Sequence, residues 1–339
     1  MNGRERVFAV LNGQKSDMVP IVPKIAFSNV LFCEGMHVAD YMTDPDCMAR
    51  ACIAAYETTG WDGVSLHTDI ASEGLAIGST YELPADNPYI LKKHLLNSIE
   101  EYEKVCVPEP LKTHPMCTVI EAAKIVRSKI GKEVFIIGWT NGPLNVASQL
   151  INLEDLMMAL IEEPELVHEL LERCLAVGVA YAKALAAAGV DAVAYGHATA
   201  SSNVIARKHY EEFALPYEKR LVSAIHASGA KAITHICGNI NPIIDLIAEN
   251  GSDVIDFDHV CDLQKLHNAA PQKVFRGNIS PSLLALGSEQ EIHEKARQLL
   301  DTPAAHTNLL FGSGCEINLN TPIKNIQAFV QAGRTFGKN

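Results

Sequence analysis

The chain has 339 residues, 48% of them hydrophobic, and its 28 Lys and Arg against 40 Asp and Glu give a formal net charge of −12. This balance argues against nucleic acid or an anionic membrane surface as a partner, because either would require a basic face. No stretch approaches 18 consecutive apolar residues and no secretory signal opens the chain, so we expect a cytoplasmic protein without membrane contact.

Eight short apolar segments predict the strands of a sheet. Several follow a glycine that ends a helical run, as in Ala188-Gly-Val-Asp-Ala-Val, which is typical of an α-to-β junction. Repeated junctions of this kind indicate parallel strands covered by helices. In chain order the predicted strands are residues 19–23, 63–66, 134–138, 192–195, 232–236, 254–257, 274–276 and 309–311.

The clearest helices between these strands are predicted at residues 164–188 and 210–228, where apolar positions keep a helical period. Thr321 and Pro322 predict the N-cap and first residue of a last helix. The long stretch between the second and third strands predicts an insertion, and we expect its proline-containing part, 83–88, to cap the barrel mouth.

Eight strands alternating with helices predict the α/β class and a single (β/α)₈ TIM barrel over residues 1–339, with an insertion between strands 2 and 3. The alternative is an open doubly wound sheet. The barrel is favoured because no G-x-G-x-x-G follows an early strand.

Three side chains that are typical ligands of soft metal ions lie at the ends of predicted strands, which is where barrels place their catalytic groups. His235 and Cys237 lie on one face of the fifth strand, about 6.6 Å apart along an extended chain. Cys315 follows the eighth strand after Ser313, whose two neighbouring glycines let the backbone turn the cysteine inward. The other cysteines, such as Cys52 and Cys174, fit reduced packing thiols.

One imidazole and two thiolates suit Zn²⁺ and leave a fourth position for substrate, so the sequence predicts a catalytic zinc site. The alternative is that His235 donates to a loop carbonyl while both cysteines only pack. Zinc with these ligands is neutral overall, so a bound substrate thiol would lose its proton and become a nucleophile for an activated methyl group.

The chain resembles the uroporphyrinogen decarboxylase superfamily and, within it, the zinc-dependent corrinoid methyltransferases of the methylcobalamin:coenzyme M type. The specific element is His235-Ile-Cys-Gly-Asn with the later Gly314-Cys-Glu-Ile; further passages mark the superfamily over essentially the whole chain. Those passages are Met1-Asn-Gly-Arg-Glu-Arg-Val, His67-Thr-Asp-Ile-Ala-Ser-Glu-Gly, Gly142-Pro-Leu-Asn-Val-Ala-Ser, Tyr210-Glu-Glu-Phe-Ala-Leu-Pro-Tyr, Gly277-Asn-Ile-Ser-Pro and Thr321-Pro.

The chain departs from the family patterns at two places. Decarboxylases carry paired arginines near the N-terminus to hold carboxylates, whereas no arginine lies between Arg6 and Arg50 here. Related zinc methyltransferases place an acidic fourth ligand 22 positions after the second ligand, where this chain has His259 beside Asp258. We therefore expect Asp258, His259 or solvent to complete the site, with His259 also a candidate catalytic residue; the alternative is that His259 is a loop residue.

Other polar residues at predicted strand ends are candidate binding groups. The resemblance implies that Asp69, a catalytic and cofactor-binding candidate, faces the corrin or substrate; a satisfied loop carboxylate is the alternative. Tyr195 and His197 follow strand four, together with Ser201 and Ser202. Asn278 and Ser280 follow strand seven, in the last loops, where barrels often bind a phosphate or sulfonate group. Lys24 is a candidate partner for a substrate anion, although a solvated lysine is the stronger interpretation.

The resemblance implies a zinc-dependent methyltransferase acting between a corrinoid, presented by a small corrinoid protein, and a thiol such as coenzyme M. One alternative is a demethylating methyltransferase that moves methyl from an O- or N-methyl donor to a Co(I) corrinoid protein. The other is a uroporphyrinogen decarboxylase or a non-catalytic tetrapyrrole-binding relative.

Overall fold

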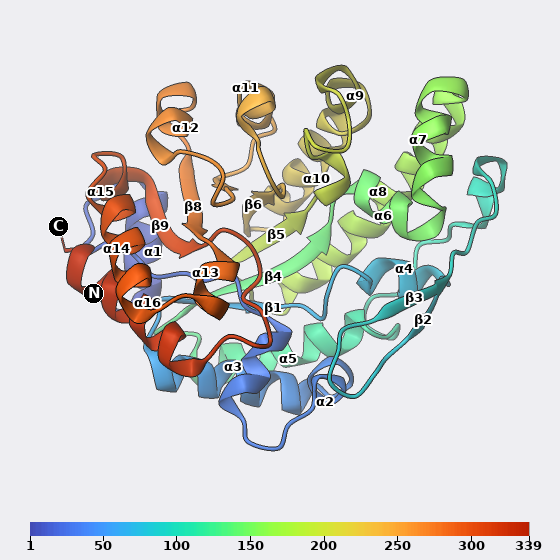
Figure 1. The fold of residues 1–339 in the computed structure, drawn as a ribbon. Coiled ribbons are helices and arrows are strands. Elements are labelled where there is room, and N and C mark those ends of the chain that lie inside the picture. Colours follow the sequence, from blue (N-terminus) through green and yellow to red (C-terminus); the bar gives the residue numbers. More distant parts are fainter. Residues whose placement is uncertain (339) are drawn as a thin grey trace.

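A curled sheet of seven parallel strands forms the centre of the computed structural model, which describes residues 1–338. Each strand pairs with the next in the order β1-β4-β5-β6-β7-β8-β9, and helices cover the outside of the sheet (Figure 1). The strands are β1 (Gly63–Leu66), β4 (Phe135–Asn141), β5 (Ala192–Gly196), β6 (Lys231–His235), β7 (Val254–Asp256), β8 (Val274–Ile279) and β9 (Leu309–Ser313). These correspond to the second to eighth predicted strands, so the α/β TIM-barrel prediction is confirmed.

The first predicted strand, residues 19–23, closes the barrel without being a regular strand. The Val22 N–H donates to the Phe311 carbonyl at 2.7 Å, and on the other side the Asp62 N–H donates to the Ile21 carbonyl at 2.7 Å. Pro20 and Pro23 have no N–H to donate, so a continuous ladder cannot form. The Asp62 carboxylate replaces one missing partner by accepting the Ile21 N–H at 2.7 Å.

Helices and short 3₁₀ turns surround the sheet, as expected for connections between parallel strands. The α-helices are α1 (Gly3–Leu11), α2 (Val38–Thr43), α3 (Pro45–Thr59), α4 (Ser72–Ile77), α5 (Met116–Ile130), α6 (Pro143–Leu150), α7 (Leu153–Glu162), α8 (Pro164–Ala187), α9 (Arg207–Phe213), α10 (Leu215–Ala227), α11 (Ile244–Ala248), α12 (Leu263–Ala269), α13 (Pro281–Leu286), α14 (Glu289–Leu300), α15 (Ala305–Asn308) and α16 (Ile323–Phe336). The 3₁₀ turns are η1 (Phe27–Phe32), η2 (Ile99–Lys104), η3 (Ala198–Ala200) and η4 (Asn241–Ile243).

Two helix predictions need correction. The stretch 210–228 is not one helix, because α9 ends at Phe213 and α10 begins at Leu215 with Pro216 in its first turn. A proline there cannot donate to the preceding turn, so the helix breaks. The last helix begins one residue later than predicted, with Pro322 as its N-cap in place of Thr321.

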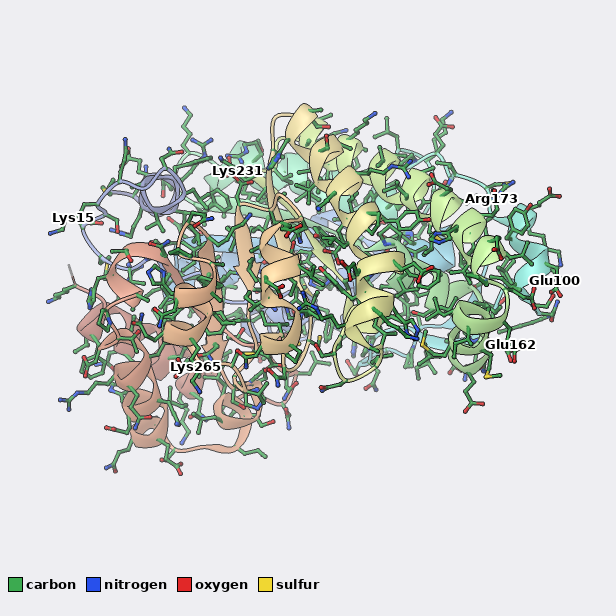
Figure 2. All side chains as sticks on the ribbon, turned by 90° about the horizontal axis from the view of Figure 1, so that it is seen from above. Lys15, Glu100, Glu162, Arg173, Lys231 and Lys265 are labelled. Carbon is green, nitrogen blue, oxygen red and sulfur yellow. The ribbon has the colours of Figure 1, made fainter. Side chains whose placement is uncertain are left out.

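The predicted insertion lies between β1 and β4. It contains α4, η2, α5 and an antiparallel hairpin of β2 (Thr80–Glu82) and β3 (Ile90–Lys93), and the proline-containing residues 83–88 belong to the connection between the two strands. Seen from above, charged side chains such as Lys15 and Glu100 project from the periphery (Figure 2). Within residues 1–338, no helix has the length and hydrophobicity needed to cross a lipid bilayer.

Side chains of alternate strand residues fill the barrel interior. This inner cluster includes Val22, Ile137, Ile233, Val254 and Val274. Because side chains alternate along a strand, positions two residues further on point to the same side. Those positions are Lys24, Trp139, His235, Asp256 and Arg276, so the upper interior layer is polar and leads to the mouth.

Candidate metal centre and active site

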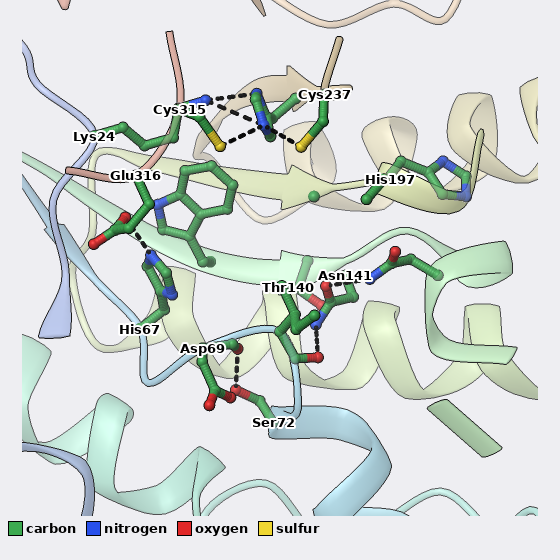
Figure 3. A pocket seen from close by; sticks show the side chains of 16 residues that line it. Lys24, His67, Asp69, Ser72, Thr140, Asn141, His197, Cys237, Cys315 and Glu316 are labelled. Atoms are coloured by element: carbon green, nitrogen blue, oxygen red, sulfur yellow. Dashed lines mark hydrogen bonds and ion pairs between the residues drawn. The ribbon is translucent and has the colours of Figure 1, made fainter. Parts of the chain in front are cut away.

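His235, Cys237 and Cys315 come together at the barrel mouth although 80 residues separate the first from the last. The His235 Nε2 atom lies 3.2 Å from the Cys237 sulfur and 3.9 Å from the Cys315 sulfur (Figure 3). The three ligand atoms all lie within 4.8 Å of one another. Sharing one tetrahedral ion requires separations of roughly 4 Å, so this arrangement fits a single metal ion with small side-chain adjustments.

The backbone around the cysteines depends on glycine. Gly238 follows Cys237 with a φ of +79°, a left-handed conformation that side chains disfavour. A Cβ on Gly314 would lie 2.7 Å from the His259 backbone nitrogen. Ser201 supports the first cysteine by donating to the Cys237 carbonyl at 2.8 Å. Gly314 therefore allows the Cys315 loop to lie close to the His259 backbone, and Ser201 supports the Cys237 loop.

The two thiols have different pKa values. The hydrogen bond between them lowers the pKa of Cys315, while the same hydrogen bond and burial raise the pKa of Cys237. His235 and Lys24 also lower the pKa of Cys315. The pair therefore favours one thiolate, which is the form that binds soft metal ions.

Lys24 is not a solvated lysine. Its residue surface is only 3% exposed, and its Nζ lies 2.5 Å from His235 Nδ1 and 3.4 Å from an Asp256 oxygen. The ammonium therefore lies directly behind the imidazole ligand. The interpretation of Lys24 as a solvated lysine was wrong, because the irregular strand 19–23 directs this side chain into the barrel.

Asp256 and Arg276 form an ion pair whose side chains have no exposed surface. The Arg276 Nε and one terminal nitrogen donate to the two Asp256 oxygens at 2.7 and 2.5 Å. Burial disfavours the carboxylate, but Arg276 and Lys24 outweigh it and lower the pKa of Asp256. The indole of Trp139 lies near both cations, with its ring centroid 5.7 Å from the Arg276 guanidinium carbon and 5.9 Å from Lys24 Nζ.

A small cavity opens beside the three ligand side chains. It has a volume of about 110 Å³ and is lined by Lys24, His67, Asp69, Ile70, Ser72, Trp139, Thr140, Asn141, Asn145, Gly196, His197, Ala198, His235, Cys237, Cys315 and Glu316. Drug-sized ligands occupy roughly 300–1,000 Å³. The space next to the sulfurs therefore fits a molecule of a few heavy atoms.

Asp69 lines this cavity, but both its oxygens are occupied. They accept the backbone N–H groups of Ala71 at 2.7 Å and Tyr89 at 2.8 Å. Asp69 therefore matches the alternative interpretation, a loop carboxylate with its hydrogen bonds satisfied. It connects the β2–β3 hairpin to the loop after β1.

Replacing Asp69 with Asn is expected to flatten the pH dependence of stability. Burial raises the pKa of Asp69 to about 6. Between about pH 4 and 6 the folded state keeps a proton that the unfolded chain has lost, so this carboxyl group lowers the free energy of unfolding as pH rises. The effect should be at most about 2 kcal/mol, allowing for partial solvent screening. Urea unfolding of both proteins across this range measures it, and parallel curves would contradict it.

Tyr195 and His197 lie away from the ligands. Tyr195 points to the helix-facing side of β5, where its hydroxyl donates to Glu218 at 3.2 Å. His197 Nδ1 lies 2.7 Å from Glu218, and its ring is directed away from the cysteines (Figure 3). Alternation explains Tyr195, because its neighbour Ala194 faces the barrel interior. Ser202 is near this loop without a hydrogen-bond partner for its hydroxyl among residues 1–338.

The structure does not bring His259, Asn278 or Ser280 to the three ligands. They line a separate cleft of about 870 Å³. His259 Nδ1 lies 2.5 Å from Asp258 Oδ1, and the other Asp258 oxygen accepts the Gly238 N–H at 3.0 Å. Asn278 donates to the Cys261 carbonyl at 2.9 Å, and Ser280 caps α13. Neither Asp258 nor His259 belongs to the group of potential metal ligands in residues 1–338.

Sequence reasoning missed His67, Trp139, Arg276 and Glu316. Trp139, for example, follows Phe135 and Ile137 at alternate positions of β4 and so shares their inward direction. The same alternation was available for Arg276 two residues after Val274. Glu316 had a weaker signal, since it follows Cys315 in a loop whose path the sequence does not determine.

A parallel barrel with an imidazole and two thiols at the carboxyl ends of its strands defines an enzyme-type scaffold with a site for a soft metal ion. The family described as uroporphyrinogen decarboxylase (URO-D) matches residues 2–336. The chain therefore belongs to the uroporphyrinogen decarboxylase family.

Known relatives within this family differ in activity. The chain is 29% identical to the methylcobamide:CoM methyltransferase MtbA of Methanosarcina acetivorans, with 98% of each chain covered. It is 26% identical to a uroporphyrinogen decarboxylase of Carboxydothermus hydrogenoformans, with 88% of each covered. A solved methyltransferase structure from Methanosarcina mazei matches with a TM-score of 0.90 at 25% identity over 99% of both chains.

Proposed function

We propose that this chain is a zinc-dependent methyltransferase that transfers a methyl group between a corrinoid, carried by a small corrinoid protein, and a small thiol such as coenzyme M. The convergence of His235, Cys237 and Cys315 beside a small cavity carries this proposal. Full-length similarity to methylcobamide:CoM methyltransferases supports it.

The three side chains suit zinc by their chemistry. Two sulfurs and one imidazole nitrogen are donors that Zn²⁺ prefers, and three protein ligands leave one position for substrate. A zinc ion bound there would lower the pKa of a coordinated thiol and keep it as a thiolate. Ser201 and Gly238 would maintain the Cys237 loop, and Lys24 would hold the imidazole from behind.

The size of the cavity supports separate positions for the two substrates. Its volume of about 110 Å³ fits a small thiol beside the sulfurs. A corrinoid would have to cover the mouth from outside, with its methyl group facing inward. In the direction toward the thiol, the carbon–cobalt bond breaks, a carbon–sulfur bond forms, and the electron pair stays on cobalt as Co(I).

The charges behind the ligands favour a bound thiolate. Lys24 and Arg276 contribute two positive charges and Asp256 one negative charge, so this buried group carries a net charge of +1. A zinc centre with a third thiolate would carry about −1, which this group would offset.

Lys24→Met is expected to lower kcat/KM for the thiol by about 10- to 100-fold while zinc stays bound. A zinc ion with two thiolates and one neutral imidazole carries no net charge, so Lys24 acts mainly on the extra thiolate. Steady-state kinetics with zinc analysis of the same samples measures both effects. Unchanged kinetics, or loss of the metal, would contradict this role.

The cavity is less suited to decarboxylation of a porphyrinogen. Such a substrate carries several carboxylates, and the described lining contains one lysine, already paired, and no arginine. This agrees with the missing arginines between Arg6 and Arg50.

The direct test is demethylation of methylcobalamin by the purified, zinc-loaded protein in the presence of a thiol. The reaction is monitored by the change in absorbance from methylcobalamin to cob(I)alamin. We expect turnover that stops when a chelator removes the metal and returns with zinc. Methylation of Co(I) from an O- or N-methyl donor without any thiol would instead support the demethylating alternative.

A further inference from the structure

Four residues that line the cavity, His67, Trp139, His197 and Glu316, carry a buried polar atom without a hydrogen-bond partner among residues 1–338. Two of these atoms, Glu316 Oε2 and His67 Nε2, lie 3.7 Å apart, which is too far for a hydrogen bond but within ion-pair distance when the imidazole is protonated. Figure 3 shows both side chains below the three ligand residues, on one wall of the cavity. An unpaired buried carboxylate oxygen costs free energy, so a ligand that donates to it would be favoured.

The orientation of Glu316 is fixed. Its other oxygen accepts the Ala26 backbone N–H at 2.6 Å, which leaves Oε2 without a hydrogen-bond donor and facing the His67 imidazole. Glu316 also follows Cys315 directly in the chain, so the carboxylate and the sulfur ligand lie on one short segment. The His67 ring packs against Trp139 at 5.1 Å between centroids. Glu316 Oε2 therefore has a defined position relative to the sulfurs.

The other charged groups of the cavity are already engaged. Lys24 pairs with Asp256 and contacts His235, and both oxygens of Asp69 accept backbone N–H groups. Among residues 1–338, the lining thus offers one carboxylate oxygen without a hydrogen-bond donor, with the His67 imidazole beside it, and no unpaired ammonium or guanidinium group. A sulfonate tail would bring a second acceptor-only anion to this wall, whereas an ammonium group would supply the missing donors.

Resting on the proposed thiol methyltransferase function, we propose that the natural thiol is an aminothiol, whose protonated amine donates to Glu316 Oε2 and His67 Nε2. Glu316 is then a specificity-determining residue. The thiol end of the substrate faces the sulfur ligands, and the ammonium end faces the Glu316–His67 wall.

A series of three thiols with the same carbon spacing tests this proposal. Cysteamine, 2-mercaptoethanol and coenzyme M differ only in carrying an ammonium, a hydroxyl or a sulfonate group. We expect Glu316→Gln to lower kcat/KM for cysteamine by about 10- to 100-fold, 2-mercaptoethanol by only a few-fold, and coenzyme M not at all or in the opposite direction. Comparing variant with wild type for each thiol removes differences in thiol acidity.

Calorimetric titration of the methylated products, 2-(methylthio)ethylamine and 2-(methylthio)ethanesulfonate, gives a readout that does not depend on turnover. The wild type should bind the amine more tightly, and Glu316→Gln should lose that preference. Asp69→Asn is the matched control, because its carboxylate lines the same cavity without a free oxygen, and it should affect all ligands alike.

The outcomes separate the two proposals. Turnover of coenzyme M in preference to cysteamine, or an equal effect of Glu316→Gln on all three thiols, would overturn the aminothiol proposal and leave the methyltransferase function standing. Absence of methyl transfer to any thiol, with amine binding that depends on Glu316, would overturn the methyltransferase function and keep the amine site.

Discussion

Replacing Cys315 with Ala is expected to remove bound zinc and to lower methyl transfer to a thiol by about 1,000-fold or more. Changes to groups that only support a metal ligand typically cost 10- to 100-fold, and loss of one of three ligands should cost more. His235 and Cys237 alone would leave a weak two-ligand site. Metal analysis by mass spectrometry, combined with the methylcobalamin assay, measures both losses in the same preparation.

The matched control is Cys261→Ala. This cysteine is buried beside the same loop, with its thiol donating to the Gly238 carbonyl at 3.6 Å, but it does not belong to the ligand cluster. It should retain zinc and activity. If Cys315→Ala kept about one zinc per chain and near-normal turnover, Cys315 would not be a ligand.

Replacing Arg276 with Met is expected to lower the free energy of unfolding by about 3–5 kcal/mol. The substitution leaves the fully buried Asp256 carboxylate without its bidentate partner, and Lys24 at 3.4 Å compensates only in part. Urea denaturation at neutral pH measures the change.

The loss should shrink toward acid pH. Arg276 lowers the pKa of Asp256, so the wild type gains stability from this carboxylate above the pKa of the unfolded chain and loses it as pH falls. The double variant Asp256→Asn with Arg276→Met removes both charges and should recover part of the stability. A single variant within about 1 kcal/mol of wild type would show that the pair contributes little.

The fold was largely predictable because parallel strands leave a strong local signal. Seven of the eight predicted strands form the sheet, since their β-branched runs are buried on both faces. The segment 19–23 had the right composition, but its two prolines prevent regular pairing. The break between α9 and α10 had the same cause, and Pro216 was visible in the sequence.

The convergence of His235, Cys237 and Cys315 could be anticipated because strand ends in a barrel meet at one mouth. Side-chain direction beyond the strands was harder to predict. Tyr195 was placed at the mouth from its position alone, although alternation with Ala194 turns it outward. Lys24 was taken as solvated because it follows the end of predicted strand 19–23, although alternation from the inward-facing Val22 directs it into the barrel.

His259 illustrates what the sequence does not determine. Its spacing after Cys237 matched a ligand position in related proteins, but a hydrogen bond to Asp258 and a half-exposed side chain place it in the neighbouring cleft. The path of that loop depends on contacts with Gly238 and Asn278, which are distant in sequence. Such long-range contacts leave no periodic signal.

The central claim is that His235, Cys237 and Cys315 hold one zinc ion with a position left for a thiol. Zinc X-ray absorption spectroscopy on the purified protein, before and after addition of cysteamine or coenzyme M, tests it most directly. We predict two sulfur donors and at least one imidazole nitrogen around about one zinc per chain, with a further sulfur donor once thiol is added. A first shell without sulfur, or one unchanged by either thiol, would contradict the account.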